Sequence, residues 1–139
     1  MRKEWIELSK YRLEKAEAAL RSAYREIEAE DYATANNRAY YSIFHAMRSV
    51  LALKGEDYKK HSGVISRFSS EYLKTELIPK EYSKLITNAS LIRNRSDYED
   101  FYICSKKDTL NLIEGADKFL DEISSFISSF EHNYDNEKD

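Results

Sequence analysis

The chain is poor in the residues that break helices or form covalent links. Its 139 residues include one proline, three glycines and a single cysteine, Cys104. A lone cysteine excludes an intramolecular disulfide, and we expect Cys104 to be a small buried side chain. Because glycine and proline are scarce, there are few sharp turns to make, and the sequence predicts a mostly helical protein.

Long apolar runs and metal-binding clusters are also missing. No run approaches the roughly 18 residues of a membrane span, and the segment from Met1 to Trp5 lacks the apolar core of a signal peptide. We therefore expect a cytoplasmic protein with no membrane partner. His45, His61 and His132 lie on different expected elements, without further ligands at metal-binding spacing. With no glycine-rich phosphate loop either, the sequence predicts neither a metal site nor a cofactor.

Charge is plentiful but uneven. Charged residues make up 34% of the sequence, and the formal net charge is −3. Residues 121–139 alone carry −5, which leaves +2 on the rest of the chain. This balance excludes the strongly basic surface of a non-specific DNA-binding protein. It still allows an anionic ligand to bind the body of the protein.

Apolar residues recur with the 3.6-residue period of a helix in five segments. The expected helices cover residues 3–30, 31–54, 62–75, a fourth segment with Pro79 in its first turn, and a fifth that follows Ser105. Asp31 is the expected N-cap of the second helix, and Gly55 is expected to stop it. The second helix has the widest apolar surface and should lie at the centre. The sequence therefore predicts an all-α protein, an antiparallel bundle of four to five helices.

The length suits one domain with one core, which we expect to span residues 1–131. Ser105 and Asp108 have the spacing of a helix-start box, which supports a helix start there. Residues 132–139 are polar and acidic, and we expect them to form a frayed tail. The eleven tyrosines are too many for a core with few hydrogen-bond partners, so many should lie at the rim, in a groove or in a subunit interface.

One polar stripe runs along the second expected helix. Its members, which step by three, four and three residues and so share a face, are Arg38, Tyr41, His45 and Arg48. Two cations, a phenol and an imidazole could line an anion-binding groove, in which arginines bind phosphate oxygens and the tyrosine stacks on a base. The alternative is a solvated face on which His45 is an ordinary structural histidine.

A second basic cluster lies on the fourth expected helix, where Arg93, Asn94 and Arg95 follow an apolar stripe. Arg93 comes four residues after Ala89 and so lies on the shoulder of the apolar face. Its guanidinium could offer five donors to a phosphate, or it could pair with Asp97 four residues on. The spacing alone favours neither interpretation.

Three strings of the sequence together resemble a known family. They are Asn37-Arg38-Ala39-Tyr40-Tyr41-Ser42-Ile43-Phe44-His45-Ala46, Lys60-His61-Ser62-Gly63-Val64-Ile65 and Arg93-Asn94-Arg95-Ser96-Asp97-Tyr98. In this order they are similar to the HEPN domain, and most similar to the small, uncharacterised prokaryotic HEPN proteins. The resemblance covers nearly the whole chain and implies a helical bundle that forms a homodimer. For many HEPN proteins it also implies a metal-independent endoribonuclease, often the toxin partner of a nucleotidyltransferase-type antitoxin.

The catalytic motif of the resembled family is an arginine, a polar residue and, a few positions on, a histidine. Arg93 and Asn94 match its first two positions, but Tyr98 stands where the histidine should be. Histidine has a pKa of about 6.5, whereas tyrosine, with a pKa of about 10, is a negligible base at pH 7. We therefore expect catalysis to be weakened or lost, unless Tyr98 acts as an acid or His45 replaces the missing histidine.

These observations leave three functions open. The favoured one is an RNA- or nucleotide-binding HEPN protein of a toxin–antitoxin or defence module, paired with a nucleotidyltransferase-like partner. Its expected ligand contacts are Arg38, Tyr41, Arg48 and Arg95. The second is an active metal-independent endoribonuclease toxin that uses Arg93 and Asn94, with His45 or Tyr98 as the replacement acid or base. The third is a non-catalytic dimeric scaffold, in which the arginines only form salt bridges.

The resemblance also implies a form of regulation. In some toxin pairs of the family, the partner adds nucleotides to a tyrosine shortly after the motif histidine. The matching position in this chain is Asp100, so Tyr98 and Tyr102 are the nearest acceptors.

Overall fold

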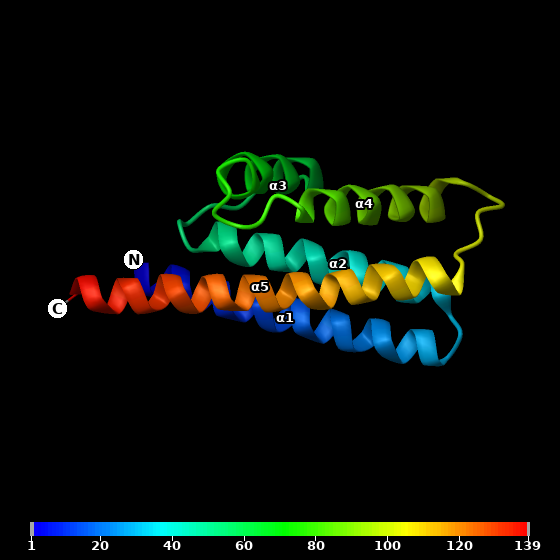
Figure 1. Cartoon of the computed structure of the whole chain (residues 1–139), viewed down its shortest axis with the longest axis horizontal. Coiled ribbons are helices and arrows are strands. Elements are labelled where there is room, and N and C mark those ends of the chain that lie inside the picture. The colour runs from blue at the N-terminus through cyan, green and yellow to red at the C-terminus, as the bar shows by residue number, and fades with distance from the viewer. Residues whose placement is uncertain (1, 139) are drawn as a thin grey trace.

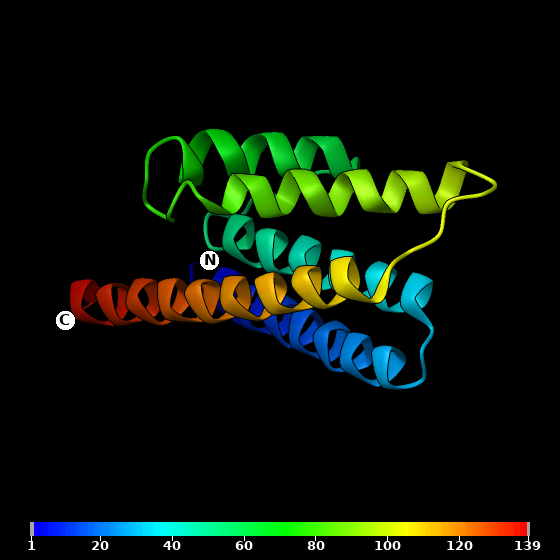
Figure 2. The same ribbon diagram turned by 45° about the vertical axis from the view of Figure 1, so that its right-hand side comes forward.

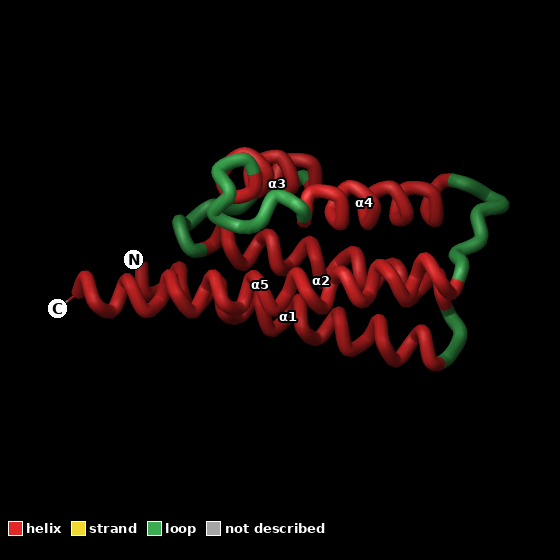
Figure 3. Tube along the Cα trace, in the orientation of Figure 1, coloured by secondary structure: helices red, strands yellow, loops and turns green. Residues whose placement is uncertain are grey.

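The structure, a computed structural model, describes residues 2–138 and confirms the all-α bundle. Five α-helices and one short π-helical turn follow one another along the chain (Figure 1). They are α1 (Arg2–Glu28), α2 (Tyr32–Ala52), α3 (His61–Phe68), the π-helical turn η1 (Ser69–Leu73), α4 (Tyr82–Tyr98) and α5 (Lys106–Lys138). Turns and loops join these elements, and no strand occurs within residues 2–138 (Figure 3).

Three long helices form the larger part of the bundle. α1 and α2 make an antiparallel hairpin, and α5 lies along both of them (Figures 1 and 2). The turn of the hairpin is tight because Asp31 caps α2, accepting a hydrogen bond from the Thr34 amide at 3.1 Å. Buried residues run along α2 from Ala35 to Ala52, since other helices pack on it from several sides. The predicted N-cap and the central position of this helix are therefore confirmed.

Of the remaining elements, α3 and α4 pack on α2 from the other side, and η1 packs on α3 and α4 (Figure 2). The chain turns towards them at Gly55, whose φ is +72°. A Cβ atom at this position would lie 2.6 Å from the Trp5 ring, so glycine is needed both for the backbone conformation and for the space. The predicted stop at Gly55 is thus confirmed.

The expected third and fourth helices differ in detail from those of the structure. α3 is α-helical only to Phe68 and continues as the π-helical turn η1. α4 begins at Tyr82, later than predicted, because Pro79 lies in the turn before the helix and its carbonyl accepts the Tyr82 amide at 3.2 Å. Pro79 therefore precedes α4 and does not occupy its first turn.

α5 starts as predicted and then runs further than predicted. Ser105 Oγ accepts the Asp108 amide at 3.1 Å, as the expected helix-start box requires. The helix continues to Lys138, through residues that we expected to form a frayed tail from position 132. Tyr134 packs against the core, and Glu137 lies 3.5 Å from Arg2 of α1. These contacts with the rest of the bundle support a helix there, although the sequence is polar.

Two further expectations concern burial. Cys104 is half-buried, less than predicted, and its Sγ lies 3.3 Å from Ser96 Oγ. Within residues 2–138, the bundle has no helix that combines the length and the apolar character needed to cross a membrane.

Candidate anion-binding site

Arg93 projects from α4 at the edge of the surface that packs on α2. Ala89 and Ile92 of the same helix are buried, which places Arg93 beside the core with its side chain half-covered. Its guanidinium carbon lies 4.8 Å from the ring centroid of Tyr40 and 5.8 Å from that of Tyr41. Both rings belong to α2. Because aromatic faces attract and orient a guanidinium, α2 fixes the position of the Arg93 charge.

His61, the first residue of α3, contacts the same guanidinium. Its Nδ1 lies 3.2 Å from Arg93 Nη1 and 2.9 Å from the Tyr40 hydroxyl oxygen. The ring packs against Phe44, with 4.1 Å between the ring centroids. Because arginine can only donate, Nδ1 accepts in this contact and carries no proton. Residues of α2, α3 and α4 thus meet at one point.

The environment of His61 favours the neutral imidazole. Burial, followed by the charges of Arg93 and Arg48, lowers the pKa of His61 below its ordinary value. Its place at the start of α3 works in the same direction, since the positive end of a helix dipole disfavours a cation. His61 is therefore neutral at pH 7.

One hydrogen-bond donor of Arg93, its Nε, is unused within the described residues. Its Nε lies 3.8 Å from Asp97 Oδ2, a charge contact that is too long for a hydrogen bond. This Nε is buried and has no hydrogen-bond partner within the described chain. Buried donors are nearly always paired in folded proteins. The Nε of Arg93 is therefore a hydrogen-bond donor that could bind an anionic ligand.

A pocket of about 360 Å³ lies beside this arginine, between α2 and α4. Its polar lining consists of Thr34, Asn36, Asn37, Arg38, Arg93, Ser96 and Asp97. Arg38 is held by Asn37 Oδ1 at 2.6 Å, and its guanidinium carbon lies 5.6 Å from the Tyr41 ring centroid. Tyr41 therefore contacts both guanidinium groups. Two arginines against one carboxylate give the lining a charge of +1, which suits a singly charged phosphodiester.

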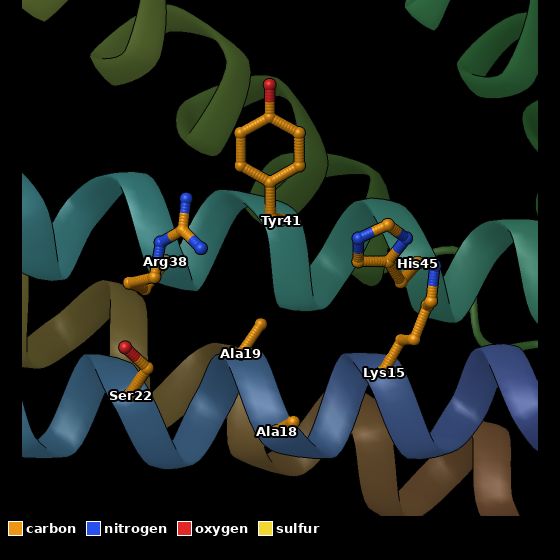
Figure 4. A pocket seen from close by; sticks show the side chains of 7 residues that line it. All are labelled: Lys15, Ala18, Ala19, Ser22, Arg38, Tyr41 and His45. Atoms are coloured by element: carbon orange, nitrogen blue, oxygen red, sulfur yellow. The ribbon is translucent and has the colours of Figure 1, made fainter.

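The rest of the polar stripe on α2 borders a different groove. Figure 4 shows Arg38, Tyr41 and His45 on α2 above Ala18, Ala19 and Ser22 of α1, with Lys15 near His45. The small α1 side chains leave a pocket of about 380 Å³. Burial, with Arg48 and other cations, lowers the pKa of His45 to about 4. His45 is thus neutral at pH 7 and faces α1, while His61 is the histidine that contacts Arg93.

Arg48 is engaged in an ion cluster. Its Nε and Nη2 lie 3.2 and 3.0 Å from the carboxylate of Asp57, and Nη2 of Arg12 lies 3.2 Å from the same carboxylate. The cluster joins α1, α2 and the loop that leads to His61. Arg48 is therefore paired with a carboxylate at hydrogen-bond distance, whereas the carboxylate of Asp97 lies 3.8 Å from Arg93.

The other expected site residues on α4 do not converge on Arg93. Asn94, Arg95 and Tyr98 are exposed, and Tyr98 has 83% of its surface accessible. On a continuous helix, residues five positions apart diverge by about 140°, and α4 is continuous through Tyr98. Tyr98 therefore points away from the pocket that Arg93 lines.

Sequence reasoning missed His61 as a site residue. His61 belongs to one of the strings that carry the family resemblance, which was the available signal, but 32 positions separate it from Arg93. Within the described part of the chain, no three His, Cys, Asp or Glu side chains converge in a way that could hold a metal ion.

Comparison with known proteins assigns the family. The family model of the HEPN domain matches residues 9–126 of the chain. The chain belongs to the HEPN domain family. The resemblance read from the three sequence strings is thereby confirmed, and the matched range of this HEPN protein includes Arg38, His61 and Arg93.

Several relatives align over most of this HEPN protein. Two proteins of Methanocaldococcus jannaschii, named "Putative toxin MJ0142" and "Putative toxin MJ0605", are each 32% identical to it. The first alignment covers 84% of this chain and 80% of the relative, and the second covers 83% and 85%. A "UPF0332 protein" of Thermotoga maritima is 33% identical over 68% of this chain and 71% of its own length.

Proposed function

We propose that this HEPN protein is the RNA-binding, toxin-type component of a toxin–antitoxin module, and that Arg93 and Arg38 bind an RNA phosphate in the pocket between α2 and α4. The observation that carries the proposal is the environment of Arg93: two aromatic rings fix its position, while its buried Nε has no hydrogen-bond partner among the described residues. The names of the two Methanocaldococcus jannaschii relatives support the toxin assignment.

The proposed contacts divide between the phosphate and a base. Arg93 Nε and the Arg38 guanidinium donate to phosphate oxygens, in the charge-assisted hydrogen bonds that arginine forms best. Tyr41, which contacts both guanidinium groups, offers a ring edge or face to a neighbouring base. Arg95 and Asn94 are exposed on the same helix and extend the basic surface along the RNA backbone.

A binding assay tests the proposal without requiring catalysis. The probe is a fluorescein-labelled oligoribonucleotide pool of random sequence with 2′-O-methyl groups, followed by fluorescence anisotropy. Arg93→Ala should weaken binding about 10-fold to 100-fold, because a hydrogen bond to a charged group contributes about 1.5–3 kcal/mol. Arg38→Ala should weaken it in the same direction.

Arg2→Ala is the matched control, because it removes the same charge from the opposite end of the bundle (Figure 1). Equal losses for Arg2→Ala and Arg93→Ala would indicate a diffuse charge effect and contradict the pocket. If Arg93→Ala instead abolishes dimerisation in a protein that never bound RNA, the scaffold function is favoured.

We further propose that the functional unit is a homodimer. Large apolar side chains stand exposed where α4 leads into α5: Phe101 and Ile103 have 95% and 85% of their surfaces accessible. A second copy that covers them would bring two Arg93 pockets near one interface. Light scattering after size-exclusion chromatography should give twice the mass of the chain, and Phe101→Ser with Ile103→Ser should give the monomer mass. A monomeric wild-type protein would contradict this.

The proposed antitoxin is a nucleotidyltransferase-type protein. Tyr98 is accessible to such a partner, and Tyr102, which is half-buried, is the other acceptor nearby. Co-expression with a nucleotidyltransferase encoded beside this protein should add nucleotide mass to the chain, and Tyr98→Phe should reduce that addition. An unchanged intact mass would remove the modification from the proposal.

A further inference from the structure

The groove between α1 and α2 adjoins the proposed RNA site, because Arg38 lines both this groove and the pocket beside Arg93. We infer that the groove binds a phosphate monoester, the terminal phosphate of an RNA strand that passes Arg38. The inference rests on the proposed binding of RNA between α2 and α4. It adds a second phosphate site and a preference for strands that end in a phosphate.

The first argument is the register of the two helices. α1 and α2 run antiparallel, so Ser22 lies opposite Arg38, and Lys15 lies opposite His45 (Figure 4). Between these two levels, two alanines of α1 leave a pocket of about 380 Å³. Seven residues of a helix rise about 10 Å. The groove therefore has room for the last nucleotide of a strand between Arg38 and His45.

The second argument is that one end of the groove is closed. One helical turn beyond His45, Arg12 of α1 reaches across to α2, where its Nη1 donates to the Arg48 carbonyl at 3.4 Å. Both guanidinium groups also bind the carboxylate of Asp57. The opposite end, at Arg38, leads to the pocket between α2 and α4. A strand that enters the groove past Arg38 therefore meets this barrier, and we expect it to end there.

The third argument is the charge of the groove. Lys15 and Arg38 contribute two positive charges, and the described residues that line the groove include no Asp or Glu. No ion pair within residues 2–138 involves either cation. A phosphate monoester carries about −1.5 to −2 at pH 7, whereas a phosphodiester within a strand carries a single negative charge. The groove therefore favours the end of a strand over its interior.

His45 adds an unused polar group to the groove. Its Nδ1 is buried and has no hydrogen-bond partner within the described chain. Burial, followed by the charges of nearby cations, lowers the pKa of His45 to about 4. These cations are Arg48 and Arg38 on α2, with Lys15 and Arg12 on α1. Tyr41 also flanks the imidazole, with 6.0 Å between the ring centroids. A bound dianion would offset the cationic charges, so the pKa of His45 should rise when the groove is occupied.

The test compares 2′-O-methyl oligoribonucleotide pools of random sequence that differ only at one end. Each pool carries fluorescein at one end and either a phosphate or a hydroxyl at the other, with separate pools for the 5′ and the 3′ end. Fluorescence anisotropy should show that one kind of phosphate end tightens binding about 10-fold, because it adds charge-assisted hydrogen bonds. Equal affinities for all the pools would overturn this inference and leave RNA binding at Arg93 intact.

Two lysine variants locate the preference. Lys15→Ala should remove it, because the cation opposite His45 is lost. Lys10→Ala is the matched control, since it removes the same charge from the same helix, where Lys10 pairs with Glu131 of α5, and it should keep the preference. A preference that survives in Lys15→Ala, or that Lys10→Ala reduces equally, would contradict binding of the end phosphate in this groove. Circular dichroism checks that both variants retain the fold.

The NMR signals of the His45 ring give a second measurement. The preferred phosphate-ended pool should raise the pKa of His45 from about 4 towards its ordinary value, and the hydroxyl-ended pool should raise it less. Inorganic phosphate is the probe for a free anion. If it shifts the His45 signals with the same affinity as the phosphate-ended pool, the groove is a site for free phosphate and the assignment to an RNA end is wrong. If neither pool binds the protein, this inference and the proposed RNA site are both wrong.

Discussion

Asp57 should stabilise the bundle far more than an ordinary surface acid does. Its carboxylate accepts hydrogen bonds from Arg48 at 3.0 and 3.2 Å and from Arg12 at 3.2 Å. The Arg12 side chain is only 11% exposed, so it cannot recover the lost contact by turning into water. Asp57→Ala would leave two guanidinium groups close together without an anion between them.

The structure sets the size of the effect. Removing one partner of a fully buried ion pair costs about 3–5 kcal/mol, while a hydrogen bond to a charged group contributes about 1.5–3 kcal/mol. The Asp57 side chain is 47% exposed, so solvent screens part of its charge, and the lower range applies. We expect Asp57→Ala to lower the free energy of unfolding by about 2 kcal/mol, equivalent to roughly 6–10 °C in Tm for a chain of this size.

Urea unfolding followed by circular dichroism measures this directly. The matched control is Glu131→Ala, which breaks an exposed pair with Lys10 at 3.1 Å and should cost less than about 0.5 kcal/mol. Equal losses for the two variants would refute the reasoning, because they would mean that the partly buried cluster is no stronger than a surface pair.

The same cluster predicts a pH dependence. Burial raises the pKa of Asp57, but the hydrogen bonds from Arg48 and the Tyr58 amide, with the charge of Arg12, outweigh burial and lower it below its ordinary value. The stabilisation by Asp57 should therefore be complete above about pH 4, the pKa of an unfolded aspartate. It should disappear as the pH falls through the lower pKa of the folded state. The free energies of unfolding of the wild type and of Asp57→Asn should therefore differ above about pH 4 and become equal only at lower pH.

Three further predictions concern other parts of the bundle. Gly55→Ala should lower stability by about 1–3 kcal/mol, measured by urea unfolding, because φ there is +72° and the new Cβ would meet the Trp5 ring; an unchanged midpoint would contradict this. His45, with its pKa of about 4, should titrate in NMR at a far lower pH than an ordinary histidine, and titration near pH 6.5 would contradict this. The free energy of unfolding should fall as the pH drops from about 6.5 to 4, because in this range only the unfolded chain binds the proton. Thr109→Val should cost about 1–2 kcal/mol, since Asn36 Nδ2 loses a buried acceptor at 2.7 Å; a neutral effect in thermal unfolding would argue against that hydrogen bond.

The fold was predictable from the sequence where local chemistry determines it. Asp31 and Ser105 start helices through contacts with residues three positions on, so their spacing is visible in the chain. Gly55 ends a helix for an equally local reason. By contrast, the extension of α5 through residue 134 depends on packing against the rest of the bundle, which polarity alone does not reveal.

The candidate site was only partly predictable, for a similar reason. The sequence identified Arg93 and Arg38 as arginines beside apolar stripes, which follows from helical periodicity. It did not predict that His61 meets Arg93, because this contact depends on how α3 and α4 both pack on α2. Periodicity also cannot distinguish Arg48, which pairs with Asp57, from Arg93, whose Nε has no hydrogen-bond partner within residues 2–138.

The most direct test of the account is an NMR titration of the arginine side-chain Nε–H signals with a 2′-O-methyl oligoribonucleotide. The buried Arg93 Nε, which lacks a hydrogen-bond partner in the described chain, should give the largest saturable shift. Arg38 should shift with the same affinity, and Arg2 should not shift. Saturable binding with shifts confined to other arginines would contradict the claim that this pocket holds the RNA phosphate.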